Sequence, residues 1–264
     1  MTDIRLLART LDDAVRAASA IPQLSSSTPL TLDEAYAVQR AGVELRRERS
    51  DDVVGVKLGF TSKAKAEQMG VSDVIIGYLT GSMAVGDGGA FNLGKAVHPR
   101  IEPEVAFRLG RDIDPAAPAA DLTDAVDGVA PAMEIIDSRY RDFKFSLEDV
   151  VADNTSACGF VIGEWLPPQQ VRDRFDLSAQ PVRLSVDGHD EASGSTRDIL
   201  GDPWQALPAV VRMAAQYGHP LAAGSVLLAG AATAAIPLRP GTVRADVGEL
   251  GSVSVRVVDG GSDV

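Results

Sequence analysis

Two glutamates separated by one residue are the first feature of this sequence that could do chemistry. Glu102 and Glu104 follow His98-Pro99-Arg100-Ile101, and apolar and polar residues alternate from Ile101 to Leu109. Alternation at period two predicts a strand, whose side chains i and i+2 project from one face about 6.6–6.8 Å apart. Two carboxylates so placed repel each other, and a hard divalent cation would remove that repulsion. A solvated strand face is the alternative interpretation.

A third carboxylate lies inside an apolar stretch further along the chain. Glu134 is flanked by Ala132-Met133 and Ile135-Ile136. Burial of a lone acid in such a strand is costly unless the acid is paired or bound to a metal. Three carboxylates would fill half of an octahedral shell and leave room for water or a chelating substrate. The three glutamates therefore predict a catalytic rather than a structural metal site.

Several ordered motifs extend this pattern over most of the chain. They are Lys57-Leu58-Gly59-Phe60-Thr61-Ser62, His98-Pro99-Arg100-Ile101-Glu102-Pro103-Glu104, Glu134-Ile135-Ile136-Asp137-Ser138-Arg139-Tyr140, Phe143-Lys144-Phe145, Val151-Ala152-Asp153-Asn154 and Leu250-Gly251-Ser252-Val253-Ser254-Val255. Together, from about residue 53 to residue 257, they resemble the hydratase and decarboxylase branch of the fumarylacetoacetate hydrolase superfamily. The resemblance implies an α+β fold with a mixed, rolled, β-sandwich-like body.

The same resemblance implies roles for individual residues. It implies Mg²⁺ or Mn²⁺ held by Glu102, Glu104 and Glu134, with Lys57 as a catalytic lysine. The substrate would be a 2-oxo or 2-hydroxydienoic acid from the meta-cleavage of aromatic compounds. The remaining candidates for substrate binding are Ile75, Arg139, Lys144, Asn154, Ser156 and Thr233.

Each of these candidates also has a structural interpretation. Lys57 could be a surface lysine that snorkels after a buried strand. Arg139 and Lys144 could pair with Asp137 or Asp142. Asn154 and Ser156 could serve as turn or cap residues, and Thr233 could simply allow a close backbone approach.

Two reactions occur in the branch that this chain resembles. One adds water to 2-hydroxypenta-2,4-dienoate, and the other decarboxylates 2-oxo-3-hexenedioate. The hydratases carry an aspartate two residues before the glycine of a Gly-Val-x-x-x-Asp-x-Gly stretch, whereas this chain has Ile75 there and Asp73 two positions earlier. Since isoleucine cannot exchange a proton, we expect decarboxylation, with water addition as the alternative. A non-catalytic partner subunit is a further alternative, although none of the expected site residues is missing.

Some polar residues are expected to lie outside the chemistry, and one departs from the family pattern. His98 is expected to be a structural histidine, since the carboxylates already suit a hard cation. Cys158 is expected to be a small buried residue rather than a nucleophile. Asp202 stands where relatives commonly have histidine or asparagine, and a negative charge near a dianionic substrate would be unfavourable.

The elements that must position these residues fall into two parts. Apolar residues at helical spacing from Ile4 to Ala18, and a Thr31/Glu34 capping box opening a helix towards Arg49, predict a helical lobe over residues 1–52. Residues 53–264 are expected to form the catalytic domain. Its predicted strands cover 53–58, 101–109, 132–136, 160–162, 182–186, 226–228, 242–247 and 252–257, with helices over 61–69 and 203–217.

Composition excludes several classes of protein. The 264 residues contain 25 Lys and Arg against 37 Asp and Glu, a net charge of −12, which argues against nucleic-acid binding. The sequence has no apolar run long enough for a membrane span, and its first 20 residues lack the apolar core of a signal peptide. A single cysteine suits a reducing compartment, so we expect a cytoplasmic protein. The resemblance implies a homo-oligomer that could associate with the hydratase acting next.

Overall fold

The structure, a computed structural model, describes residues 2–62, 73–117 and 122–260. Its α-helices are α1 (Ile4–Arg16), α2 (Leu32–Arg47), α4 (Leu147–Ala152), α5 (Pro168–Arg174) and α6 (Ala206–Tyr217). The helix predicted over 61–69 falls almost entirely outside the described residues. No helix in the described ranges is both long enough and apolar enough to cross a membrane.

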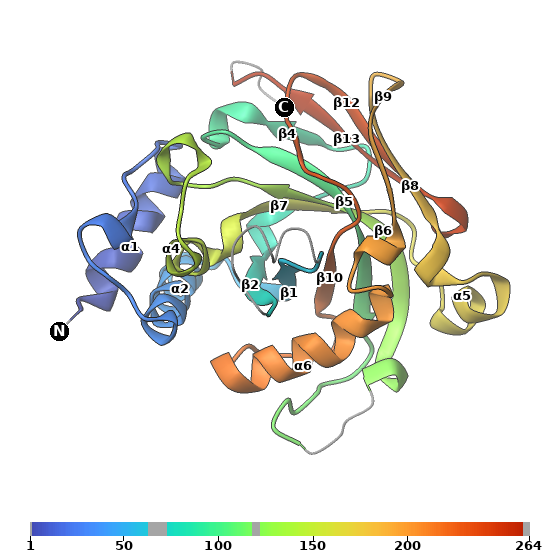
Figure 1. Cartoon of the computed structure of the whole chain (residues 1–264), viewed down its shortest axis with the longest axis horizontal. Helices are drawn as coiled ribbons and strands as arrows, with labels where there is room; N and C mark the ends of the chain where they lie inside the picture. The colour runs from blue at the N-terminus through green and yellow to red at the C-terminus, as the bar shows by residue number, and fades with distance from the viewer. Residues whose placement is uncertain (1, 63–72, 118–121, 261–264) are drawn as a thin grey trace.

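The N-terminal helices form as the sequence predicts. Glu34 N donates to Thr31 Oγ1 (3.2 Å) and Thr31 N donates to Glu34 Oε2 (2.9 Å), which is the expected capping box at the start of α2. An ion pair of 2.6 Å between Arg49 and Asp12 joins the end of this segment to α1. The two helices lie together at one edge of the molecule (Figure 1).

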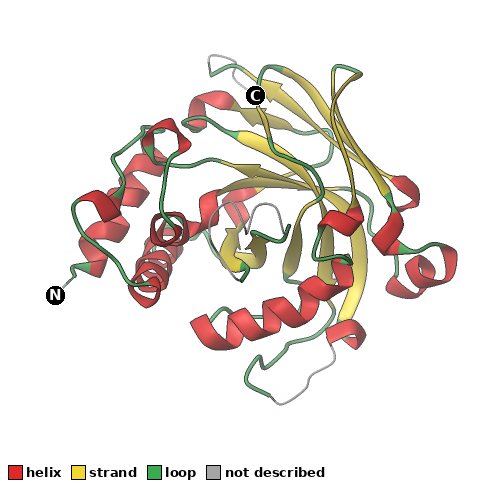
Figure 2. Ribbon diagram, in the orientation of Figure 1, coloured by secondary structure: helices red, strands yellow, loops and turns green. Residues whose placement is uncertain are grey.

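The strands form two sheets, shown in yellow in Figure 2. The larger sheet runs in the order β2 (Ile75–Thr80), β1 (Val53–Gly59), β10 (Val226–Ala231), β5 (Arg100–Leu109), β6 (Val126–Ile136), β7 (Ala157–Ile162) and β3 (Ala84–Val85), with β11 (Ile236–Pro237) added to β5. The smaller sheet runs β4 (Ala90–Asn92), β13 (Gly251–Val258), β12 (Gly241–Val247), β8 (Pro181–Val186) and β9 (His189–Ser195).

The larger sheet is curled and is buried on both faces. Its outer face packs on the helices through residues such as Val56, Leu58 and Phe107, and on the smaller sheet through Ile101 and Met133. Its inner face carries a separate apolar cluster that contains both Leu79 of β2, at one end of the sheet, and Phe160 of β7, near the other end. Because the two ends of the sheet meet on this face, it is the inside of the curl.

Burial decides between the two interpretations of the Glu102/Glu104 strand. Glu102 and Glu104 are only 6% and 1% exposed, since β5 is the central strand of the curled sheet. The alternative of a solvated strand face is wrong. An alternating pattern is typical of a half-buried strand, and here the polar residues of that pattern face an enclosed interior instead of water.

The remaining expectations for the elements are largely confirmed, with differences in length. The strands predicted over 132–136 and 226–228 correspond to β6 and β10, which are longer than predicted. The helix predicted from residue 203 begins with a 3₁₀ turn, Pro203–Gln205, before α6. The polar edge strand β9 was not predicted, because exposed residues such as His189 and Glu191 give it no apolar pattern. The apolar strand β2 was not predicted either.

Candidate metal centre

The three glutamates meet on the inner face of the curled sheet. In the antiparallel pairing of β5 with β6, Glu102 lies directly opposite Glu134, and Glu104 is two residues further along on the same face. One carboxylate oxygen from each residue lies within 4.8 Å of the other two. The strand register alone therefore assembles the cluster from two positions far apart in the sequence.

Lys57 joins this cluster from the neighbouring part of the sheet. Lys57 is 3% exposed, and its Nζ lies 3.0 Å from Glu134 Oε1. The snorkelling alternative is therefore wrong, because the ammonium group points into the interior and pairs with a fully buried carboxylate. Among the described residues, one cation, Lys57, faces three carboxylates at this point, so this part of the site carries more negative than positive charge.

Burial and mutual repulsion disfavour the ionised forms of these acids. Burial, together with the neighbouring Glu134 and Glu102 carboxylates, raises the pKa of Glu104 well above its ordinary value. Burial also raises the pKa of Glu134, to about 7, although the Lys57 ammonium acts in the opposite direction. Such an arrangement is costly without a further positive charge.

One carboxylate oxygen is held by the backbone while others lack a donor. Gly230 N donates to Glu104 Oε2 at 2.8 Å. Glu104 Oε1 and Glu134 Oε2 are buried and have no hydrogen-bond donor among the described residues. Clustered carboxylate oxygens that lack donors, with no sulfur or imidazole ligand, fit a hard divalent cation such as Mg²⁺ or Mn²⁺.

The glycine at position 230 is required by this geometry. Its φ is +112°, which L side chains rarely adopt, and a Cβ there would lie 2.1 Å from Thr61 Oγ1. The absence of a side chain lets β10 turn its amide towards Glu104.

Ile75 lies on the same side of the sheet as Lys57. It is buried and pairs with Gly59, two residues after Lys57, so both side chains project from one face. Asp73 does not take its place, because Arg212 donates to both of its oxygens at 2.6 Å on a half-exposed surface. The next residue, Ile76, projects from the opposite face of β2, although both isoleucines belong to the same large apolar cluster.

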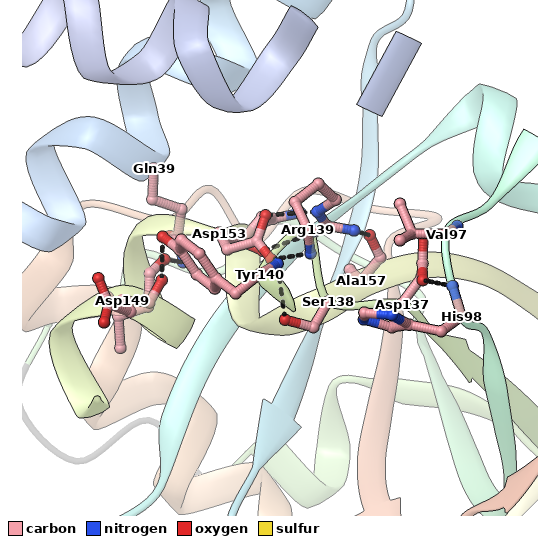
Figure 3. Close-up of polar contacts among 12 residues, drawn as sticks. Gln39, Val97, His98, Asp137, Ser138, Arg139, Tyr140, Asp149, Asp153 and Ala157 are labelled. Carbon is pink, nitrogen blue, oxygen red and sulfur yellow. Dashed lines mark hydrogen bonds and ion pairs between the residues drawn. The ribbon is translucent and has the colours of Figure 1, made fainter. Parts of the chain in front are cut away.

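Arg139 is occupied by a partner that sequence reasoning did not consider. Its guanidinium pairs with Asp153 and donates to the backbone carbonyls of Asp153 and Ala157 (Figure 3). Arg139 is 3% exposed and its backbone NH also donates to Asp153. This geometry does not favour the predicted contact between Arg139 and a substrate, nor the alternative pairing with Asp137 or Asp142.

Asp137 has a structural task of its own. Its two carboxylate oxygens accept from Val97 N and His98 N, both at 2.9 Å, and so fix the chain just before β5 (Figure 3). His98 is not a member of the glutamate cluster, and its ring Nε2 is buried without a hydrogen-bond partner among the described residues. Its ring lies 5.1 Å from that of Phe143.

The other side chains predicted to bind substrate differ in whether they already form hydrogen bonds within the chain. Asn154 accepts from Tyr78 N (2.8 Å) and donates to Tyr78 O (2.9 Å), so its amide clamps the backbone of β2. Thr233 donates to Ala234 O. Lys144 is exposed, and Ser156 Oγ is buried without a partner among the described residues. Ser156 is thus the one hydroxyl of this set that is both buried and available.

Two residues near the site, Thr155 and Arg100, were not predicted from the sequence. Thr155 is buried, and its hydroxyl has no partner in the described part of the chain. Arg100 lies on the same strand face as Glu102, and its guanidinium covers the ring of Phe143 at 4.4 Å. Spacing from Glu102 could have indicated Arg100, whereas nothing in the sequence pattern distinguishes Thr155 from its neighbours.

Two further expectations concern residues outside the cluster. Cys158 is half-buried rather than buried as expected, and desolvation of its thiol raises the pKa to about 12, so a thiolate nucleophile is disfavoured at neutral pH. Asp202 caps a 3₁₀ turn by accepting from Trp204 N at 3.0 Å. Asp202 therefore has a structural role at this position, which asparagine could fill equally well.

Comparison with known proteins identifies the family. The family model described as "Fumarylacetoacetate (FAA) hydrolase C-terminal" matches residues 52–258. The chain belongs to the fumarylacetoacetate hydrolase family.

Within this family, relatives of two activities are similar to the whole chain. A 4-oxalocrotonate decarboxylase of Pseudomonas sp is 49% identical over 252 residues, covering 95% of this chain and 96% of the relative. A 2-keto-4-pentenoate hydratase of Paraburkholderia xenovorans (strain LB400) is 34% identical over 249 residues, covering 93% of this chain and 91% of the relative. The predicted fold class is thereby confirmed at the level of the family.

A solved structure supports the same grouping. The 4-oxalocrotonate decarboxylase from Pseudomonas putida G7, complexed with magnesium and adipate, superposes with a TM-score of 0.91 at 32% identity. The match covers 98% of this chain and 99% of that chain.

Proposed function

We propose that this chain decarboxylates 2-oxo-3-hexenedioate (4-oxalocrotonate) to 2-hydroxypenta-2,4-dienoate and CO₂, as a divalent-metal-dependent carboxy-lyase. The observation that carries the proposal is Ile75, buried on the same face as Lys57, where a hydratase of this branch has an aspartate. The 49% identity to a decarboxylase, against 34% to a hydratase, points the same way.

The reaction requires an electron sink at the C2 oxygen. When bound by Glu102, Glu104 and Glu134, Mg²⁺ or Mn²⁺ would supply a Lewis acid for the C1 carboxylate and the C2 oxo group. Cleavage of the C5–C6 bond releases CO₂, and its electron pair becomes the C4=C5 double bond. The C3=C4 pair moves to C2–C3, negative charge develops on the C2 oxygen, and that oxygen takes up one proton.

The chain's own residues favour this movement of charge. Lys57 holds a positive charge in an enclosed interior, where it stabilises the developing oxyanion more strongly than it would in water. Ile75 offers an apolar wall, which favours uncharged CO₂ over a carboxylate. Of the predicted substrate ligands, Ser156 is the best placed to donate a hydrogen bond to the substrate, because its hydroxyl is buried and unpartnered in the described residues.

In the described part of the chain, Asp73 does not serve the hydratase alternative. Water addition needs a residue that positions or deprotonates water, and Asp73 is held by both nitrogens of Arg212 away from the interior. A non-catalytic partner subunit is not favoured either, because Lys57 and all three glutamates are present and clustered.

The setting of the enzyme forms part of the proposal. We expect a cytoplasmic homo-oligomer in which residues 1–52 form a helical lobe on a catalytic domain of residues 53–264. A complex with the hydratase that consumes the product has a chemical reason, since the dienol product tautomerises in water.

The experiment that tests the proposal is metal reconstitution. Chelator-treated protein should be inactive towards 2-oxo-3-hexenedioate, and added Mg²⁺ or Mn²⁺ should restore CO₂ release together with the absorbance of the dienol. Activity that persists after removal of the metal would contradict the proposal.

A further inference from the structure

A buried threonine hydroxyl lies beside Lys57 on the inner face of the sheet. Gly77 of β2 pairs directly with Lys57, so a side chain at position 77 would project from the same face. A Cβ built on Gly77 would lie only 2.1 Å from Thr155 Oγ1. The Thr155 hydroxyl therefore occupies the space that a side chain opposite Lys57 would fill.

The Thr155 hydroxyl has nothing to bond to in the described residues. The residue is 3% exposed, and its Oγ1 is buried without a hydrogen-bond partner among those residues. Buried polar groups are nearly always paired, because an unpaired one loses its hydration without compensation. The hydroxyl is thus available to a hydrogen-bond partner beyond the described residues, such as an oxygen of a bound ligand or a water molecule.

The backbone that presents this hydroxyl is strained. Asn154, Thr155 and Ser156 have φ values of 49°, 52° and 60°, three successive non-glycine residues in the left-handed region. Each such residue is disfavoured, and runs of them are rare. Residues in such conformations persist only where the surrounding structure fixes them, and they concentrate at functional sites.

Neighbouring contacts hold the turn in place. The Asn154 amide is bonded to both backbone groups of Tyr78, and Asp153, which precedes the turn, is paired with buried Arg139. Ser156 O accepts from Asp137 N at 2.8 Å at the other end. These contacts use the groups on either side of Thr155 and leave its hydroxyl free to point inward.

We infer that the Thr155 hydroxyl is a substrate-binding group that donates a hydrogen bond to an oxygen of the 2-oxo acid on the Lys57 side of the site. This inference rests on the proposed function. It adds a neutral donor next to the ammonium group of Lys57, aimed at an oxygen that carries or develops negative charge. Gly77 is then required to leave the space that this donor occupies.

The test compares Thr155→Val with Thr155→Ser. Valine keeps the shape but removes the hydroxyl, and serine restores it. The probe for binding is 2-oxoadipate, the saturated analogue of the substrate, which has no alkene to accept the electrons of decarboxylation. We expect Thr155→Val to lower the affinity for 2-oxoadipate and kcat/KM by on the order of 10–100-fold, and Thr155→Ser to recover most of both.

The stability of the ligand-free protein separates a functional from a structural role. Because valine replaces an unsatisfied buried hydroxyl, Thr155→Val should unfold at the same or a higher temperature than the wild type. Thr242→Val, the same change at an exposed position of β12, serves as the matched control and should leave binding and turnover unchanged.

The outcomes are distinguishable. If wild-type protein neither binds 2-oxoadipate nor releases CO₂, the proposed function fails. If the wild type does both and Thr155→Val matches it within twofold, the role of Thr155 is refuted. A lower unfolding temperature in Thr155→Val, in parallel with its loss of activity, would also refute it, since the hydroxyl would then be structural.

Discussion

Replacement of Lys57 by methionine should abolish most of the turnover while the fold is retained. The ammonium group lies 3.0 Å from Glu134 Oε1. At that distance and an effective dielectric constant of about 20, two unit charges interact by about 5–6 kcal/mol. An oxyanion that develops at a similar distance from Lys57 would lose at most this much, which corresponds to about 10⁴ in rate. We therefore expect a loss of on the order of 10²–10⁴-fold in kcat.

The stability of Lys57→Met should depend on pH in a defined direction. Glu134 has a folded pKa of about 7 against an ordinary value of 4.5, so the folded state binds a proton that the unfolded state releases. Stability is then lost as pH rises between these values. Removal of the Lys57 ammonium raises the pKa of Glu134 in the folded state further. The stability of Lys57→Met should therefore be closest to that of the wild type below pH 7 and lower than that of the wild type above pH 7.

The assay follows CO₂ release and thermal unfolding in parallel at pH 6.5 and pH 8. The predicted result is a large loss of kcat at both pH values and a loss of stability mainly at pH 8. Unchanged kcat with a raised KM would mark Lys57 as a group that binds substrate and transition state equally. Unchanged kcat and KM would refute its catalytic role.

Four further predictions concern the site and its support. Glu104→Gln should weaken Mg²⁺ binding, measured by calorimetry, at least 10–100-fold while circular dichroism stays that of the wild type; undiminished affinity would exclude Glu104 as a ligand. Because the raised pKa values of Glu104 and Glu134 make protons compete with the metal, Mg²⁺ affinity should rise by about ten- to a hundredfold per pH unit from pH 6 to 7, as one to two protons are released, and a flat profile would contradict this. Ile75→Asp should lower CO₂ release by on the order of 10–100-fold, because a carboxylate there repels the leaving carboxylate and hydrates the pocket, and an unchanged rate would remove Ile75 from the site. Arg139→Met should cost about 3–5 kcal/mol in chemical unfolding, because Asp153 is left buried without its partner, and a loss under 1 kcal/mol would show that the pair is not structural.

The metal cluster was predictable because strand geometry is regular. Alternation fixes Glu102 and Glu104 on one face, and an acid within an apolar strand needs compensation wherever that strand lies. The pairing of Glu102 opposite Glu134 was not predictable from spacing, because register between strands depends on how the whole sheet curls. Residue spacing also could not show whether the polar face meets water or an enclosed interior.

The roles of Arg139, Asn154 and Thr155 show where sequence reasoning fails. All three are polar residues near motifs of the family, and their types alone suit substrate binding. They differ in whether the side chain already has a partner. The Arg139 guanidinium pairs with Asp153 and the Asn154 amide bonds to the backbone of Tyr78, whereas the Thr155 hydroxyl has no partner in the described residues. The turn at residues 154–156 has left-handed backbone angles that no pattern in the sequence predicts.

The most direct test of the central claim is the partition between two reactions. Purified protein with Mg²⁺ is given 2-oxo-3-hexenedioate in one vessel and 2-hydroxypenta-2,4-dienoate in another, and CO₂ release is compared with water addition at equal enzyme concentration. With Ile75 beside Lys57, we predict rapid CO₂ release and no appreciable hydration. Efficient hydration without CO₂ release would contradict the decarboxylase assignment and leave only the family membership standing.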